Sequence, residues 1–329
     1  MHDRHSPTSH RSMLGGLALS ILAGLSLPMQ SRANGALAAA IDDSVAAAAV
    51  SFGSGFVLLG IAALAYPAAR RALGRLRQVL RDRTLPVWYL LAGVLGAWLV
   101  VAQSISVRVF GVALFSIALI AGQTVGGLLV DRLGFPRSTP RPLTATRIGA
   151  AALTVVAVAW SVSGGLHAGD SLATTALVAL LPLSAGVLSG FQQGLNGFTS
   201  TVTKAPFAAT FMNFLVGTTA LLLLTVVTRI GTGKALVPTM PGVWWMYLGG
   251  ALGIVFIFSG AFLVPRIGVL RFTVTAVAGQ LTGSLLLDLL WPAAGSQVTW
   301  ATIGGTLLTF AAIAWSSAPD LRRARRLGD

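Results

Sequence analysis

The chain of 329 residues contains no cysteine and no glutamate, and only 10% of its residues are charged. The absence of cysteine excludes disulfides, thiolate catalysis and cysteine-based metal sites. The four histidines all lie outside the apolar spans described below: His2, His5, His10 and His167. We therefore expect no carboxylate or imidazole in the middle of a membrane span to carry protons.

Signature motifs of several enzyme classes are also missing. The sequence contains no H-E-x-x-H, no G-x-S-x-G and no Walker loop. These motifs position a zinc-activated water, a serine nucleophile and a nucleotide phosphate, respectively. We therefore predict that the protein is not an enzyme, that it has no catalytic residues, and that it needs no metal or cofactor.

What the chain does have is an excess of apolar residues. Hydrophobic residues make up 55% of it and its mean hydropathy is +0.80, which is too apolar for a soluble domain. Runs of about 20 apolar residues are long enough to cross a bilayer as helices. These runs show no period-two alternation, which favours helices over the strands of a membrane barrel. The predicted fold is an all-α polytopic membrane protein.

We predict ten transmembrane spans, five in each half of the chain. The first half holds spans at residues 13–31, 44–66, 86–107, 110–130 and 146–163. The second half holds spans at residues 172–194, 207–228, 243–264, 267–287 and 299–317. The expected domains are a disordered cytoplasmic N-terminus (1–12), a first repeat (13–165), a second repeat (166–318) and a basic cytoplasmic tail (319–329).

The two halves repeat one another. A first block recurs at a constant offset of 162 residues, as Asn34 and Asn196 illustrate, and a second block recurs at 157 residues, as Asp131 and Asp288 illustrate. An odd number of spans in each copy reverses the orientation of the second copy. The sequence therefore predicts two inverted five-helix repeats, which is an architecture typical of secondary transporters.

Basic residues are distributed unequally between the two sides of the predicted spans. Of the 23 Lys and Arg residues, 19 fall on one side, and only Arg32, Arg108, Arg229 and Lys234 fall on the other. Because basic loops stay in the cytoplasm, we predict cytoplasmic N- and C-termini for this multi-pass membrane protein. The net charge of +14 does not indicate nucleic-acid binding, since no basic stripe with interleaved aromatics is present.

The first span has a second interpretation. Arg4 and Arg11 precede an apolar stretch that is followed by small residues, as in a secretory signal peptide. Removal of this stretch would leave the span at 172–194 without a counterpart, so we favour a retained span. Residues 70–83 form the longest polar loop, and we expect a basic helix there at the cytoplasmic membrane surface, chiefly as a determinant of topology.

The motifs that repeat resemble those of a known family. The residues that carry the resemblance in the first copy are Gly24, Gln30, Asn34, Gly35, Ser51, Phe52 and Gly55. Those of the second copy are Gly186, Gln192, Asn196, Asn213, Phe214 and Gly217, followed by Trp245, Gly250, Gly253, Gly279 and Gln280. In order, spacing and doubling they resemble the YdcZ-like family of inner-membrane proteins in the drug/metabolite transporter (DMT) superfamily. The resemblance implies an exporter built as a fused pair of five-helix units.

Amide side chains are the candidates for a substrate pathway. Gln30 and Asn34 share a helix face, as do Gln192 and Asn196, because they are four residues apart. An amide in hydrocarbon is costly without a hydrogen bond, so these groups face either protein or a wet cavity. The alternative role is a hydrogen bond between helices. The full candidate set is Gln30, Asn34, Gln123, Gln192, Asn196, Asn213 and Gln280.

Glycines and aspartates in the repeats have structural interpretations. Close helix packing is the expected role of Gly55, Gly122, Gly126, Gly217, Gly279 and Gly283. Asp131 and Asp288 end equivalent spans, and we expect each to be solvated or paired with a neighbour such as Arg132.

The leading hypothesis is a secondary transporter, an exporter of a small metabolite or amphiphile that works by alternating access between the copies. Without a buried carboxylate, a neutral, zwitterionic or anionic substrate fits better than a cation exchanged for protons. The alternative hypothesis is a membrane scaffold or partner subunit that does not transport. The expected partners are a small-molecule substrate and the lipid bilayer, and a homodimer is a further candidate assembly.

Overall fold

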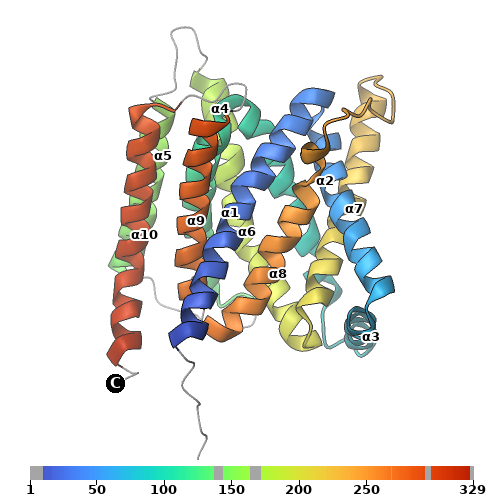
Figure 1. Ribbon diagram of the computed structural model, residues 1–329, viewed down its shortest axis with the longest axis horizontal. Helices are drawn as coiled ribbons and strands as arrows, with labels where there is room; N and C mark the ends of the chain where they lie inside the picture. The colour runs from blue at the N-terminus through green and yellow to red at the C-terminus, as the bar shows by residue number, and fades with distance from the viewer. Residues whose placement is uncertain (1–9, 137–143, 164–171, 268, 293–297, 327–329) are drawn as a thin grey trace, which may run out of the picture.

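The computed structural model describes residues 10–136, 144–163, 172–267, 269–292 and 298–326 (Figure 1). All regular secondary structure in these ranges is helical, which confirms the all-α prediction. The α-helices are α1 (His10–Ile41), α2 (Ser44–Ala65), α3 (Pro67–Arg81), α4 (Ala92–Leu133), α5 (Ala145–Ser163), α6 (Leu172–Thr203), α7 (Pro206–Gly231), α8 (Gly249–Ile267), α9 (Val269–Leu290) and α10 (Trp300–Arg326). Two short 3-10 helices, η1 (Val87–Leu91) and η2 (Trp244–Tyr247), precede α4 and α8.

Five helical segments of the described chain are long and apolar enough to cross a membrane. They are Ser44–Ala65, Val87–Leu133, Ala145–Ser163, Val178–Thr203 and Pro206–Gly231. Shorter apolar helices lie at Gly249–Gly260, Thr275–Leu290 and Trp300–Trp315. In Figure 1, α1 and the C-terminal helices α8 to α10 run alongside these spans.

The segment α4 contains two of the predicted spans rather than one. Its regular geometry breaks at Gly111, which has φ 81° and ψ −178°. Before the break α4 runs antiparallel to α6, since Trp98 bonds Ser184 and Ser106 bonds the earlier Val178 carbonyl. After the break α4 runs parallel to α6, since Gly122 meets Gly186 and Gly126 meets Gly190. The chain therefore turns back at Gly111, where a residue with a Cβ would be strained.

The helices alternate in direction through the molecule. In Figure 1, α1 begins at the lower face, where α10 also ends, and α6 begins at the upper face. The first copy therefore starts at the face that holds both termini, and the second copy starts at the opposite face. This arrangement confirms the prediction of two inverted repeats. We call these two surfaces the terminal face and the far face.

Close contacts between the copies obey the same two-fold relation. A Cβ on Gly24 would collide with Ala276, and one on Gly186 would collide with Leu119. Each of these residues is the repeat counterpart of a residue in the other contact. Three further pairs of contacts are related in the same way. The contact of Gly122 with Leu183 corresponds to that of Gly279 with Ile21, and the contact of Gly55 with Phe214 corresponds to that of Gly217 with Phe52. The contact of Gly149 with Trp315 corresponds to that of Gly304 with Trp160. Such reciprocal pairing is the signature of a two-fold interface.

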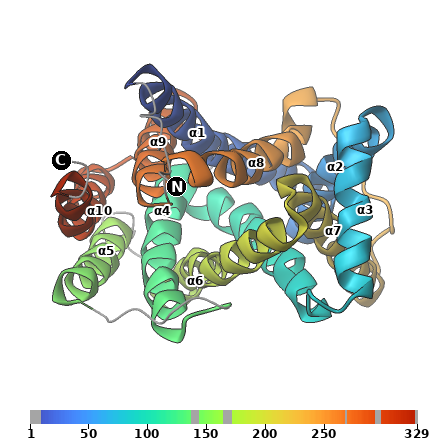
Figure 2. The ribbon, with the colours of Figure 1, turned by 90° about the horizontal axis from the view of Figure 1, so that it is seen from below.

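Two aromatic side chains lie at the centre of this interface. Phe52 of α2 and Phe214 of α7 are repeat counterparts, and their ring centroids are 5.0 Å apart. Both are almost completely buried, together with Val100, Val101 and Leu221. The two copies thus share one apolar centre. Figure 2 shows α5 and α10 at the edge of the molecule farthest from α2, α3 and α7.

The basic helix expected within 70–83 corresponds to α3, which lies across the ends of the spans at the terminal face (Figures 1 and 2). Its buried face consists of Ala69, Ala72 and Leu76. The guanidinium of Arg75 donates to the carbonyls of Thr203 and Lys204 at the end of α6, at 2.8 and 3.4 Å. These bonds satisfy carbonyls that a helix leaves without intrahelical partners.

Three helices extend beyond the predicted spans. The expected first span ended at residue 31, but α1 continues to Ile41, and α6 continues to Thr203 rather than residue 194. The amides at these positions therefore lie within long helices and not at their ends. The expected C-terminal tail is helical as far as Arg326. Residues 1–9 of the expected disordered segment lie outside the described residues.

Candidate functional site

The candidate amide Asn34 of the first copy belongs to a buried polar group that we call the α1 cluster: Asn34, Gln103 and Ser31 are joined by hydrogen bonds, and Ser51 lies with Asn34 against Gly249. Asn34 donates from Nδ2 to Oε1 of Gln103 at 2.7 Å, and Gln103 in turn donates from Nε2 to the hydroxyl of Ser31. All four side chains are buried, and Asn34 has no exposed surface at all. Because Asn34 and Ser31 lie in the last third of α1, this cluster is nearer the far face.

The second copy forms an equivalent group, the α6 cluster, consisting of Gln192, Asn196 and Asn213. Gln192 and Asn196 both donate to Oδ1 of Asn213, at 3.0 and 3.4 Å. Gln192 and Asn213 are buried, whereas Asn196 is partly exposed. This cluster is nearer the terminal face, because α6 runs in the opposite direction to α1.

Each amide cluster faces glycines of the other copy. In α8, a Cβ on Gly249 would collide with Asn34 and Ser51, and one on Gly253 would approach Gln30. In α4, a Cβ on Gly96 would collide with Gln192 and approach Asn213. Glycine therefore lets the backbone of one copy lie directly against the amides of the other. Both clusters consequently lie between the copies.

Several polar atoms in these clusters have no hydrogen-bond partner among the described residues. They are Oδ1 of Asn34, Oγ of Ser51 and Nδ2 of Asn213, with Oγ1 of Thr218 one turn beyond Asn213. A buried polar atom without a partner is costly, and it commonly marks a place that water or a ligand completes. The clusters thus have hydrogen-bonding capacity that the protein itself does not use.

The remaining candidates lie elsewhere in the interface. Gln280 is buried in α9, and Gln123 is partly exposed in α4. Among the described residues, no hydrogen bond joins either of them to a cluster. They lie beside the glycine contacts that pack α4 on α6 and α9 on α1. The structure therefore separates the seven candidates into two clusters, with Gln30 beside the first, and two isolated glutamines.

Sequence reasoning missed Gln103, which is the central residue of the α1 cluster. Its counterpart by the 157-residue offset is Gly260, so it does not belong to the repeated pattern. A glutamine within the apolar run of the third predicted span was nevertheless a detectable signal, because polar side chains are rare in such runs. The candidates were chosen among polar residues that occur in both copies, and Gln103 occurs in only one.

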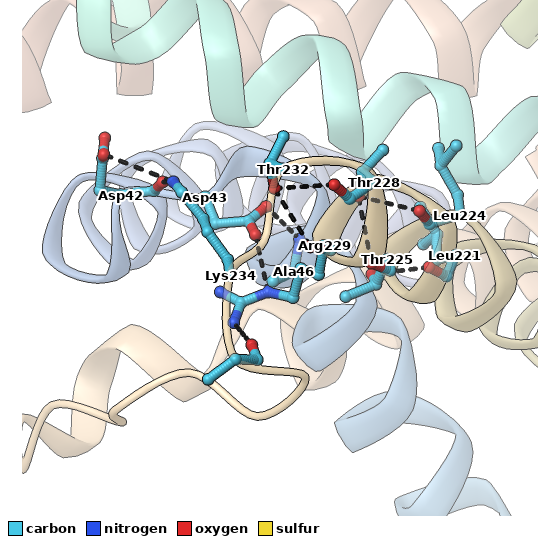
Figure 3. A network of polar contacts seen from close by, with 11 residues as sticks. Asp42, Asp43, Ala46, Leu221, Leu224, Thr225, Thr228, Arg229, Thr232 and Lys234 are labelled. Atoms are coloured by element: carbon cyan, nitrogen blue, oxygen red, sulfur yellow. Dashed lines mark hydrogen bonds and ion pairs between the residues drawn. The ribbon is translucent and has the colours of Figure 1, made fainter.

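The far face is held together by ion pairs (Figure 3). Arg229 of α7 bonds Asp43 at 2.9 Å, and both side chains are largely buried. Arg229 also donates to the carbonyl of Ala235. Lys234 and Arg108 both pair with the exposed Asp42, at 3.7 and 3.3 Å. Three of the four basic residues that the sequence places on this side are therefore paired with the two aspartates of the loop between α1 and α2.

Asp288 corrects an expectation from the sequence. It was expected to be solvated or paired with a neighbour, but only 4% of its surface is exposed. Its carboxylate accepts hydrogen bonds from the backbone N–H groups of Val112 and Ala113, at 3.1 and 2.7 Å. Its counterpart Asp131 pairs not with Arg132 but with Arg147, at 2.7 Å.

A known protein family matches the chain twice, once in each of the two repeats seen in the structure. The family model described as "Putative inner membrane exporter, YdcZ" matches residues 15–160 and again residues 177–315. The chain belongs to the YdcZ-like family. The two matches coincide with the two inverted repeats, which confirms the resemblance inferred from the sequence. The family is one of membrane transporters and not of enzymes.

Solved structures support the fold alone. One described as "Crystal structure of protein" is 20% identical to the chain, with a TM-score of 0.53. The similarity covers 98% of this chain and 100% of the solved one. No protein with a curated description matches the chain.

Proposed function

We propose that this YdcZ-like protein is a secondary transporter that exports a small metabolite or amphiphile from the cytoplasm. Family membership and the inverted repeats support this function. Because inverted repeats are structurally equivalent, one copy can rock against the other between two packings of similar energy. One packing is open to one side of the membrane and the other packing to the opposite side. The substrate pathway would run between the copies, past the α1 and α6 clusters.

One observation carries the proposal: equivalent amide clusters lie on the interface between the copies, one toward each face, and both retain unused polar atoms. A purely structural hydrogen bond between helices would be satisfied within the protein. A polar group that must exchange water for substrate keeps free capacity. The clusters therefore have the composition expected of a pathway for a substrate with polar groups.

Differences in burial between the copies also fit alternating access. Toward the far face, the first arm of α4 is tightly buried, with Val100 and Val101 only 2% and 6% exposed. The counterpart of Val101 is Phe258 of α8, on the side of the terminal face, and it is 43% exposed. The two-fold relation is thus broken in packing although it is kept in sequence. This asymmetry agrees with a state closed at the far face and more open at the terminal face.

The cytoplasmic location of the terminal face is part of the proposal. It rests on the 19 basic residues that the sequence assigns to that side, and on the pairing of three of the four basic residues at the far face with Asp42 and Asp43. With this orientation, the α6 cluster is the one that meets a substrate from the cytoplasm. Export then ends with release past the α1 cluster.

A ligand screen on the purified protein tests the function. A small molecule that binds the native state raises the melting temperature. Compounds that do so are then assayed for flux in proteoliposomes. We expect Asn196→Ala to weaken binding by about 5- to 150-fold, because the ligand loses a desolvated partner worth about 1–3 kcal/mol. The melting temperature should change little, because water can replace the lost bond.

The matched control is Gln193→Ala, which removes an exposed amide from the same helix. It should leave both binding and stability unchanged. If Asn196→Ala lowers the melting temperature while flux per folded molecule is unchanged, the cluster amides only join helices and the site assignment is wrong. If no substrate class gives flux in a sealed vesicle, the scaffold alternative gains support.

A further inference from the structure

The helix α3 presents a group of positive charges at the terminal face. Residues 67–83 contain six arginines and a single acidic residue, Asp82. The six arginine side chains are all exposed: Arg70, Arg71, Arg75, Arg77, Arg81 and Arg83. Two of them donate to backbone carbonyls, and none of the six forms an ion pair with any residue that the structure describes. The positive charge of this helix is therefore not paired within the described protein.

The spacing of these arginines makes their charge unfavourable for an isolated helix. Arg71 and Arg75 are four residues apart, as are Arg77 and Arg81, so each pair shares one side of α3. Like charges at this spacing repel one another and destabilise a helix. An anion that binds beside such a pair removes the repulsion, so we expect α3 to be most stable in contact with anions.

The arginines form two rows, one on either side of the buried face of α3. The inner row, Arg71 and Arg75, lies toward the end of α6, where Arg75 donates to the carbonyls of Thr203 and Lys204. The outer row consists of Arg70, Arg77 and Arg81. Spacings of seven and four residues return to the same side of a helix with 3.6 residues per turn. The outer row is therefore a continuous line of three charges on the flank away from α6.

The outer row lies next to apolar surface that faces lipid. Arg70 donates to the carbonyl of Leu64 at 2.8 Å, near the end of α2. Leu64 and Ile61 are 78% and 56% exposed, and both belong to the candidate membrane span Ser44–Ala65. Tyr66, which follows this span, is 64% exposed, and tyrosine is typical of the membrane–water interface. The outer row thus begins where a lipid-facing helix ends.

The ends of the spans determine the depth of α3 in the membrane. Only Tyr66 separates α2 from α3, and the contact of Arg75 with α6 holds α3 beside Thr203, where α6 ends. The next span, α7, begins at Pro206. Figure 1 shows α3 across these ends, and Figure 2 shows it at the edge of the molecule. Because spans end where the hydrocarbon core ends, α3 lies at the level of the lipid headgroups.

From these observations we infer that α3 binds the phosphate groups of anionic phospholipids through its outer row. Guanidinium groups bind phosphate oxygens through parallel N–H bonds as well as by charge. Clusters of basic residues directly beside a span attract anionic lipids, and each residue adds to the attraction. The bound lipids supply the anions that α3 lacks. This binding does not depend on transport and goes beyond the role of α3 in setting topology.

A lipid fits this surface better than a soluble anion does. Sites for soluble small molecules are concave and enclose most of the ligand. The outer row instead runs along an exposed helix flank, which encloses nothing. A lipid phosphate needs no pocket, because its acyl chains pack against apolar surface such as that of Leu64 and Ile61 and keep the headgroup beside the arginines.

Energy transfer to labelled lipids tests this binding without any substrate. The chain has no native cysteine, and a Cβ on Gly74 would meet no atom within 4 Å, so a donor dye can be attached at Gly74→Cys in α3. The full-length protein is placed in phosphatidylcholine nanodiscs with a trace of acyl-labelled acceptor, either phosphatidylglycerol or phosphatidylcholine. We expect more transfer to phosphatidylglycerol. The excess should fall at about 1 M salt, because ions screen exposed charges.

Substitutions assign the lipid preference to the outer row. Arg77→Gln should lower the preference for phosphatidylglycerol about fivefold, and Arg77→Gln combined with Arg81→Gln should lower it roughly 25-fold, from the contribution of one basic residue near an anionic surface. The matched control is Arg132→Gln, which removes an exposed arginine from α4 instead of α3. It should leave the preference unchanged.

Equal transfer to the two labelled lipids in the parent protein would overturn the inference, even if a substituted variant does not fold. So would a full preference in the double variant, or its loss in Arg132→Gln. Loss of the preference on addition of millimolar inorganic phosphate at constant ionic strength would show that the row binds soluble anions instead. No substrate enters the assay, so failure of the proposed function would leave each of these outcomes unchanged.

Discussion

The packing of the two copies through glycine can be tested by adding a single methyl group. In α6, a Cβ on Gly186 would overlap three backbone atoms of α4: the carbonyl oxygen of Leu119, the nitrogen of Gln123 and the Cα of Gly122. Backbone atoms cannot rotate away, so Gly186→Ala must push the two helices apart. Overpacking of this kind costs about 1–3 kcal/mol.

The same helix provides the control. Gly197 has no atom within 4 Å of the position of an added Cβ. Gly197→Ala should be neutral or stabilise the protein by up to about 1 kcal/mol, because alanine has the higher helix propensity. The difference in free energy of unfolding between the two variants is therefore expected to be about 1–4 kcal/mol, from the ranges for overpacking and helix propensity together.

Thermal unfolding in detergent measures this difference as a change in melting temperature. The repeat supplies an independent second test, because Gly24→Ala should behave as Gly186→Ala does, and Gly15→Ala, whose Cβ also meets nothing within 4 Å, should behave as Gly197→Ala does. Equal melting temperatures for Gly186→Ala and Gly197→Ala would show that α4 and α6 are not packed as described, and would remove the basis for the two-fold interface.

Two further predictions concern the far face and the orientation of the chain. Arg229→Ala should destabilise the protein by about 3–5 kcal/mol, because it leaves the largely buried Asp43 carboxylate without its partner. Lys234→Ala should cost no more than about 1 kcal/mol, since its ion pair is exposed. Similar melting temperatures for the two variants would contradict the buried ion pair. A cysteine introduced at Gly74 in α3 should react with a membrane-impermeant reagent only from the cytoplasmic side, and one introduced at Leu236 only from the periplasmic side. The reverse pattern of labelling in intact cells would refute the orientation.

Much of the fold could be predicted because its signals are periodic or repeated. Apolar runs in a chain with 10% charged residues define helices whatever their neighbours are. The repeat of Asn34 as Asn196 and of Asp131 as Asp288 requires two similar units, and five spans in each require inversion. Helix ends were harder to predict: α1 and α6 continue past their polar residues because those residues are buried in the interface.

The candidate site depended on information that the sequence does not contain. The sequence indicated Gln30, Asn34, Gln192 and Asn196 as candidates for one substrate pathway, but inversion places the two pairs toward opposite faces. Gln103 joined the α1 cluster through a contact 69 residues from Asn34, which no local pattern reports. No local pattern reports, either, that the candidate amides Gln123 and Gln280 lie outside both clusters.

The sequence by itself determined the membrane environment, the helical class and the duplicated, inverted plan, because each follows from composition and spacing along the chain. Tertiary structure alone decided which atoms of the two copies meet. Asp288 shows the difference: as a residue at the end of an apolar span it is expected to be solvated, yet the reversal at Gly111 brings two unpaired N–H groups to it and buries all three. Burial and partners are properties of the packed chain, and they determine whether such a carboxylate is only a boundary marker or a group whose charge holds two copies together.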